Sequence, residues 1–282
     1  MNVIVHGGAG GEPDEPTPRQ GILDEAAQVG SEAETVVDAV EAAVHVLESS
    51  PRFNAGVGGA VQSDGVVRTD AGIMTSDREA GAACSMPGVE HAVSAARVVM
   101  EETPHVFVSG EHAVDLAADF GVETGVDLWS EKSRERWAEY DTPDGSPSEH
   151  LDWLREKFGG HDTVGAVAYD GTQFAAATST GGRWLALAGR VGDVPQIGSG
   201  FYAAPAGAAS STGAGEDIAK ATLTRRAVRH LESGYDAGEA ADRAIEEFAE
   251  LTGSEAGVIV LDRDGNSGSA FNTDAMQTAV NR

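Results

Sequence analysis

Apolar residues recur at every third or fourth position over several stretches of the chain, a spacing typical of amphipathic helices. In the first of these stretches, Val36, Val40, Val44 and Leu47 would share one helical face. On this basis helices are expected at residues 31–48, 89–101, 111–120, 216–232 and 237–252.

Short apolar runs that end at glycines or at Asp-Gly pairs predict strands. The pairs at residues 64–65, 170–171 and 264–265 are each expected to turn a hairpin. Strands are expected at residues 2–6, 106–108, 164–170, 173–180, 257–262 and 267–271. Because helices and strands occur in blocks rather than in strict alternation, the pattern favours an α+β or layered antiparallel fold over a parallel sheet.

Residues 123–162 show neither spacing. The segment is rich in charge and contains Pro143, Pro147 and the turn-forming residues 144–146. We expect it to pack poorly, with a short helix at 148–157, and to be a functional or linking segment.

Acidic residues outnumber basic ones by 46 to 19, which gives a formal net charge of −27. Such a surface would repel nucleic acid, so a DNA- or RNA-binding function is disfavoured. The carboxylates are spread along the chain rather than gathered in one block. This distribution favours the hypothesis of a halophilic surface, where salt screens the repulsion between carboxylates.

Targeting and redox features are few in this chain of 282 residues. Cys84 is the only cysteine, which excludes an intramolecular disulfide and a cysteine-based metal site. The first residues lack the basic and apolar regions of a signal peptide, and no apolar run approaches the roughly 20 residues of a membrane helix. A cytoplasmic location is therefore expected.

Most common catalytic signatures are missing from the sequence. It has no GxxxxGK[ST] phosphate loop, no HExxH zinc helix and no GxSxG nucleophile elbow. The glycines at 7–11 and 56–59 do not complete a nucleotide-binding GxGxxG, and the eight histidines show no metal-ligand spacing. His6, which follows an apolar strand, is expected to be structural.

A set of threonines and one Arg-Asp pair remains. Thr163 stands between the charged segment and a predicted strand, and residues 178–182 (TSTGG) end the next strand. Residues 210–216 (SSTGAGE) lead into a helix, and Arg190 and Asp193 share a glycine-rich turn. Taken singly, these are an ordinary strand residue, a β-turn, a helix cap and a surface ion pair of little energetic value.

Taken together and in this order, they resemble the threonine-dependent asparaginases and isoaspartyl peptidases of the N-terminal-nucleophile hydrolases. The family-like strings are HGGAG (6–10), FNAGVGGAV (53–61), SAARVVMEETPHVFVSGE (94–111), DTVGAVAYD (162–170), AAATSTGG (175–182), GRVGD (189–193) and STGAGE (211–216). The resemblance covers nearly the whole chain except residues 123–161. It implies a single domain of the α+β class, built as a four-layer αββα sandwich, and a dimer of αβ units.

The resemblance also implies that the chain cuts itself between Asp162 and Thr163, giving an α chain (1–162) and a β chain (163–282). Thr163 would then supply the nucleophilic hydroxyl, and its freed α-amine would act as the base. An α-amine with a pKa of about 7.7–8.0 can take a proton at neutral pH. One residue would thus supply two members of a catalytic triad, without a catalytic histidine.

Supporting roles follow for six further residues. Thr180 is expected to hydrogen-bond the nucleophile, and Thr212 with the Gly213 N–H is expected to form the oxyanion hole. A small amino-acid or dipeptide substrate would be held by its α-carboxylate and α-ammonium groups, the first on Arg190 and the second on Asp193 and the Gly215 carbonyl.

No cofactor is expected for catalysis, but one loop resembles the family's sodium site. There the ion is held by backbone carbonyls, which suit a hard cation. The matching positions are Leu47, Glu48, Ser50, Phe53, Ala55 and Val57.

Several alternatives stay open. Many asparaginases of this group have glycine before the nucleophile, whereas His161-Asp162 resembles the junction of glycosylasparaginases, which cleave sugar-linked asparagine. A non-enzymatic acidic scaffold would remain one intact chain. A serine or cysteine hydrolase would need Cys84 or a triad histidine.

Overall fold

A seven-stranded sheet forms the centre of the computed structural model, which describes residues 1–140, 146, 148–149, 151 and 163–282. Neighbouring strands are antiparallel, except that the last two run parallel. Their order is β11 (Ala275–Asn281), β1 (Asn2–Gly10), β5 (Val164–Tyr169), β6 (Phe174–Thr180), β2 (Arg68–Thr75), β3 (Ala80–Pro87) and β4 (Phe107–Ser109).

A second, antiparallel sheet of four strands packs on one face of the first. Its order is β10 (Ser267–Phe271), β9 (Ala256–Asp262), β8 (Gly207–Gly213) and β7 (Phe201–Ala204). Buried side chains such as Ile4, Val167, Phe201 and Ile259 fill the space between the sheets. Alternate residues of each strand therefore enter one apolar layer, as expected for stacked sheets.

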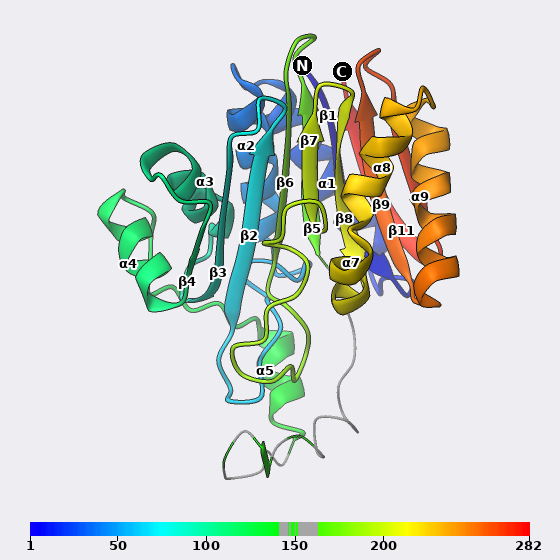
Figure 1. Cartoon of the computed structure of the whole chain (residues 1–282). Helices are drawn as coiled ribbons and strands as arrows, with labels where there is room; N and C mark the ends of the chain where they lie inside the picture. The colour runs from blue at the N-terminus through cyan, green and yellow to red at the C-terminus, as the bar shows by residue number, and fades with distance from the viewer. Residues whose placement is uncertain (141–145, 147, 150, 152–162) are drawn as a thin grey trace.

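Helices cover the two outer faces (Figure 1). The larger sheet is covered by α1 (Pro16–Ser31), α2 (Val36–Glu48) and α3 (Ala92–Glu102), and the smaller by α8 (Leu223–Glu232) and α9 (Ala237–Thr252). The shorter helices are α4 (Glu111–Asp119), α5 (Glu131–Trp137) and α7 (Gly215–Ala221). The predicted four-layer αββα sandwich is confirmed. Within the described ranges, no helix combines the length and apolar character that a membrane crossing requires.

Two expected helices have different boundaries from those predicted. The helix predicted from residue 31 starts only at Val36, because the Thr35 hydroxyl caps it by accepting from the Asp38 N–H at 3.1 Å. The helix predicted at 216–232 is broken into α7 and α8 by Thr222, whose φ of 52° lies in the left-handed region. Residues 16–31 and 275–281 form α1 and β11, which the apolar spacing did not indicate.

The expectation of poor packing is wrong for the first part of segment 123–162. The helix α5 begins with a capping box between Ser130 and Ser133. The Trp137 ring then packs edge-on against Trp129 and Trp184, at centroid distances of 5.9 and 6.4 Å. Aromatic contacts, which a charge-rich composition hides, therefore order residues 128–140. The helix predicted at 148–157 lies largely outside the described residues.

Candidate active site

Thr163 directly precedes β5, a central strand of the larger sheet. The pairing of β5 with β6 sets Val164 opposite Ser179, so that Thr163 comes opposite Thr180. Both threonines are buried, and the Thr163 hydroxyl donates to Thr180 Oγ1 at 3.4 Å. The Gly182 N–H also donates to Thr180 Oγ1, at 3.0 Å. The structure therefore brings the first predicted pair together, while Asp162 lies outside the described residues.

Thr212 and Gly213 end β8 in the smaller sheet. The buried Thr212 hydroxyl accepts from the Ala9 N–H at 3.3 Å, which ties β8 to β1, the strand beside β5. Gly213 has a φ of 135°, and a Cβ there would lie 2.6 Å from the Glu255 carbonyl oxygen. Only glycine fits this close approach of two backbones.

A buried chain of hydrogen bonds joins the two sheets close to Thr163. His6 Nε2 lies 2.9 Å from Ser210 Oγ, which lies 2.7 Å from Thr178 Oγ1. Burial lowers the pKa of His6 to about 3, so its imidazole is neutral. His6 therefore connects β1 to β8 and β6 by polar contacts, in keeping with a structural residue.

Arg190, Asp193 and Gly215 meet at the start of α7. A Cβ on Gly215 would lie 2.7 Å from Asp193 Oδ1 and 2.9 Å from Arg190 Nη2, so both charged groups border this glycine. Arg190 Nε donates to Glu216 Oε1 at 2.8 Å. Among the described residues, Arg190 Nη2 and Asp193 Oδ2 are buried and have no hydrogen-bond partner. A buried donor and a buried acceptor are thus left for a third group.

The charged groups of this site perturb each other. Burial raises the pKa of Asp193 to about 7, against the charge of Arg190, and the charges of Glu216 and Asp70 raise it further. Burial also opposes ionisation of Glu216, but the hydrogen bond from Arg190 lowers its pKa to about 2. At neutral pH the Arg190 charge is therefore partly balanced by Glu216, while Asp193 stands near its titration midpoint.

Asp70 is a further residue of this site, and no sequence motif indicates it. It lies on β2 opposite Thr180, is buried, and accepts from the Ser85 N–H at 2.7 Å. Burial raises its pKa to about 7, against the Ser85 hydrogen bond and the charge of Arg190. The sequence signal was a single acidic residue within an otherwise buried strand, a placement that favours function.

The predicted sodium loop offers six backbone carbonyls. The carbonyls of Leu47, Glu48 and Ser50 each accept a backbone N–H, at 3.3, 2.9 and 3.2 Å, and a carbonyl oxygen has a second lone pair. Those of Phe53, Ala55 and Val57 accept no backbone N–H from the described residues. These oxygens fit the donor chemistry of a hard monovalent cation.

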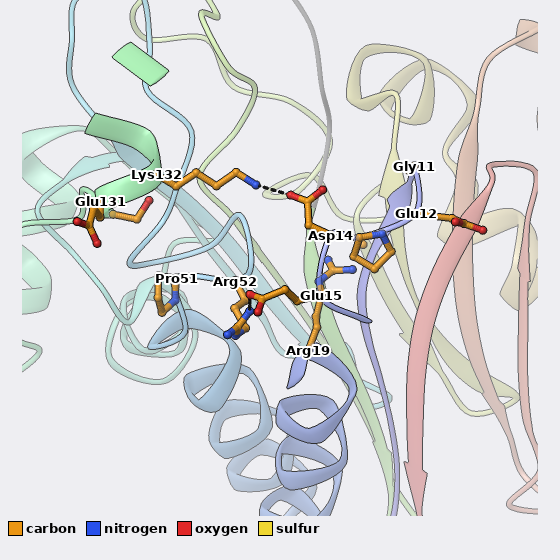
Figure 2. A pocket seen from close by; sticks show the side chains of 13 residues that line it. Gly11, Glu12, Asp14, Glu15, Arg19, Pro51, Arg52, Glu131 and Lys132 are labelled. Carbon is orange, nitrogen blue, oxygen red and sulfur yellow. Dashed lines mark hydrogen bonds and ion pairs between the residues drawn. The ribbon is translucent and has the colours of Figure 1, made fainter. Parts of the chain in front are cut away.

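A pocket of about 540 Å³ adjoins the site through β1 (Figure 2). Gly8 and Gly10 line it, while the N–H of the intervening Ala9 donates to Thr212. Figure 2 shows Lys132 and Asp14 joined across the pocket, at 3.0 Å. The predicted catalytic groups do not line this pocket, so it is a neighbour of the site rather than its reacting centre.

Cys84 does not suit a cysteine hydrolase. Its thiol is buried, and burial together with the charge of Asp70 raises its pKa to about 12. A thiol that stays protonated at neutral pH is a poor nucleophile.

Comparison with known proteins gives the family. The sequence model of the family described as Asparaginase matches residues 1–282. The chain is 40% identical to the plant-type L-asparaginase of Pyrococcus abyssi over 98% of this chain and 95% of that protein. It is 38% identical to the isoaspartyl peptidase/L-asparaginase of Danio rerio, over 99% of this chain and 91% of that protein. It is 37% identical to the isoaspartyl peptidase/L-asparaginase of Bos taurus, over 99% of this chain and 92% of that protein. The chain belongs to the asparaginase family of N-terminal-nucleophile hydrolases.

Proposed function

We propose that the protein hydrolyses the side-chain amide of L-asparagine, the β-aspartyl bond of isoaspartyl dipeptides, or both. The observation that carries this proposal is that two buried atoms beside Gly215, Arg190 Nη2 and Asp193 Oδ2, have no hydrogen-bond partner among the described residues. The first group suits an α-carboxylate and the second an α-ammonium, the two charged groups of an amino acid. The names of the relatives support the same substrates.

The position of Gly182 supports a connection between the two halves of the site. Its N–H donates to Thr180 Oγ1, and a Cβ on it would lie 4.0 Å from Arg190 Nη1. An amino acid bound through its α-groups at Arg190 would therefore extend its side-chain amide toward Thr163 and Thr180. This direction fits hydrolysis of a side-chain amide rather than of an α-peptide bond.

The proposed reaction uses groups of the protein and one water molecule. The hydroxyl of Thr163 attacks the amide carbon, and its α-amine takes the hydroxyl proton and passes it to the departing ammonia or amine. Thr212 and the Gly213 N–H would stabilise the negative oxygen of the intermediate. Water then hydrolyses the resulting ester and releases aspartate.

This chemistry requires a free amine on Thr163, so we propose a cut between Asp162 and Thr163. The products would be chains 1–162 and 163–282 of a single domain. The position of Thr163 supports this proposal, because its buried side chain stands directly before the buried strand β5 and lies beside Thr180.

Steady-state kinetics on three substrates test the function. We expect turnover of L-asparagine or of β-aspartyl-leucine, and little of an N-glycosylated asparagine. Preference for the glycosylated substrate would favour the glycosylasparaginase alternative suggested by His161-Asp162, which lie outside the described residues. Failure to hydrolyse all three would contradict the proposal.

The KM for L-asparagine is expected to rise as the pH falls through about 7. Below the raised pKa of Asp193 its carboxyl becomes neutral and no longer attracts the substrate ammonium. The increase should approach about tenfold per pH unit if binding needs the ionised form. Measuring KM between about pH 5 and 9 checks this, because the range brackets the carboxyl and α-amine pKa values.

The matched control for this pH profile is Asp70→Asn. The charge of Asp70 raises the pKa of Asp193, so its removal should move the KM inflection to lower pH. An inflection that stays in place or moves upward would show that Asp193 does not govern binding.

We also propose that the loop 47–57 holds a sodium ion through its backbone carbonyls. The free lone pairs of these oxygens support the proposal. The melting temperature in NaCl should exceed that in choline chloride at equal ionic strength. Equal values in the two salts would contradict it.

A halophilic surface is proposed from the net charge of −27. Raising KCl from low to molar concentration should raise the melting temperature by several degrees, because salt screens the repulsion between carboxylates. Chloride is the suitable anion, since sulfate stabilises folded proteins generally. A melting temperature that is flat or falls with KCl would exclude the hypothesis.

A homodimer of αβ units is proposed from an apolar hollow on the surface. Val106, Phe107 and Ile197 are 50%, 48% and 40% exposed and line this hollow together. Apolar patches of this kind often mark an interface. Analytical ultracentrifugation would decide the question, and a monomer at micromolar concentration would contradict the proposal. The cytoplasmic location stays a prediction.

A further inference from the structure

Two histidines and a glutamate meet on the helical side of the larger sheet. His45 lies in the last turn of α2, Glu48 ends that helix, and His91 directly precedes α3. One ligand atom from each residue lies within 4.8 Å of the other two. The two imidazole rings lie 4.1 Å apart, tilted by 34°. Residues 46 positions apart in sequence thus form one cluster.

Glu48 is the fixed member of this cluster. Its side chain is fully buried, and Oε1 accepts from Ser179 Oγ at 2.6 Å and from the Val93 N–H at 3.1 Å. Its other oxygen, Oε2, lies 3.4 Å from His91 Nδ1. One carboxylate oxygen is therefore oriented by partners, as in protein metal sites, while the second faces the histidines.

The histidines form the accessible side. Their side chains are 34% and 31% exposed, and both line a surface pocket of about 500 Å³ together with Ser94 and Glu41. Glu41 Oε1 lies 3.9 Å from His45 Nε2, and Glu90 Oε1 lies 4.0 Å from His91 Nε2. Arg97 lines the same pocket and pairs with Glu41 and Glu101, but Glu102 and Glu123 line it as well. An incoming cation would thus meet an excess of acidic groups and an open path.

We propose that His45, Glu48 and His91 form a binding site for a divalent transition metal ion, with Zn²⁺ as the best match. Two imidazole nitrogens and one carboxylate oxygen are a ligand set that zinc accepts, with a fourth position open to water. Zinc bonds of about 2 Å require the ligand atoms to approach to roughly 3.3 Å. Rotation of the two histidines, which are about one-third exposed, can supply this approach, in exchange for the contact of 2.7 Å between His45 Nε2 and Ser94 Oγ. The site shares Glu48 with the sodium loop but uses its side-chain carboxylate, whereas the loop uses main-chain oxygens, and it is independent of the proposed hydrolysis.

Equilibrium dialysis of the untagged protein against ZnCl₂, at constant NaCl, tests the site. We expect one Zn²⁺ per chain and a loss of affinity of at least about tenfold in the double variant His45→Ala/His91→Ala. The matched control is His112→Ala, which removes an exposed histidine from α4 and should leave zinc binding unchanged. Circular dichroism establishes that the variants remain folded.

A second readout uses Co²⁺ in place of zinc. Visible absorption of the bound ion should appear in the wild-type protein and in His112→Ala, and should be lost in Glu48→Gln and in the double variant. Absence of stoichiometric binding to the wild-type protein, or affinity unchanged in the double variant, would overturn the assignment.

Discussion

Replacing Thr163 with alanine is expected to leave a single polypeptide of 29.0 kDa and to abolish turnover. The hydroxyl that starts both the backbone cut and the amide hydrolysis is then missing. The wild-type protein should instead give two fragments of about 17 and 12 kDa, in proportion to their shares of the 282 residues. Intact mass spectrometry and a denaturing gel measure the cut, and ammonia release measures turnover.

The control for this variant is Thr163→Ser, which keeps a hydroxyl at the same position. It should be cut more slowly than the wild-type protein and should retain measurable activity. Cleavage that persists in Thr163→Ala would refute the assignment of the nucleophile. An active wild-type protein that remains one uncut chain would refute the free amine as the base and favour another kind of hydrolase.

The second large effect is expected for Arg190→Ala. Removing one partner of a buried charge pair costs about 2–5 kcal/mol, which corresponds to a loss of roughly 30- to 4,000-fold in kcat/KM. The loss should fall mainly on KM, because the guanidinium holds the α-carboxylate of the substrate and not its reacting amide. Kinetics on L-asparagine measure the split between KM and kcat.

Arg183 provides the matched control for Arg190. Its side chain is similarly buried, 15% exposed against 14%, and it pairs with the same Glu216. Arg183→Ala should therefore reproduce the loss of an ion pair without the loss of the substrate contact. Equal losses in the two variants would mean that Glu216, rather than the carboxylate of the substrate, explains the effect.

Local patterns in the sequence were sufficient to predict the positions of the helices and strands whose apolar residues follow a regular spacing. The helices α2 and α9 and the strands β5, β6 and β9 lie within a few residues of their predicted positions. The helix α1 was not predicted because its buried face carries Arg19, two alanines and Gly30 beside Leu23, which gives only a weak apolar spacing. The strand β11 was not predicted because it is an edge strand with only partial burial, and its partner β1 is 265 or more residues away in sequence.

The candidate site also divides into residues that local sequence identifies and residues that depend on contacts between distant parts of the chain. The residues at Thr163, Thr180, Arg190, Asp193 and Gly215 stand in strings that resemble a family, so a single sequence identified them. Asp70 and the cluster of His45 with His91 lie outside the strings that resemble the family. They become visible only through strand register, burial and contacts between helices, which local sequence does not encode.

The strand order has a consequence for a protein that is cut before Thr163. In the larger sheet β1 lies between β5 and β11, and β2 pairs with β6, so strands from before and after the cut are interleaved. The halves could separate only by breaking backbone ladders on both sides of β1. Once denatured, they would have to find each other again, so renaturation would become second order and slow on dilution. The molecule would be assembled once, as one chain, and its survival would then depend on its rate of unfolding.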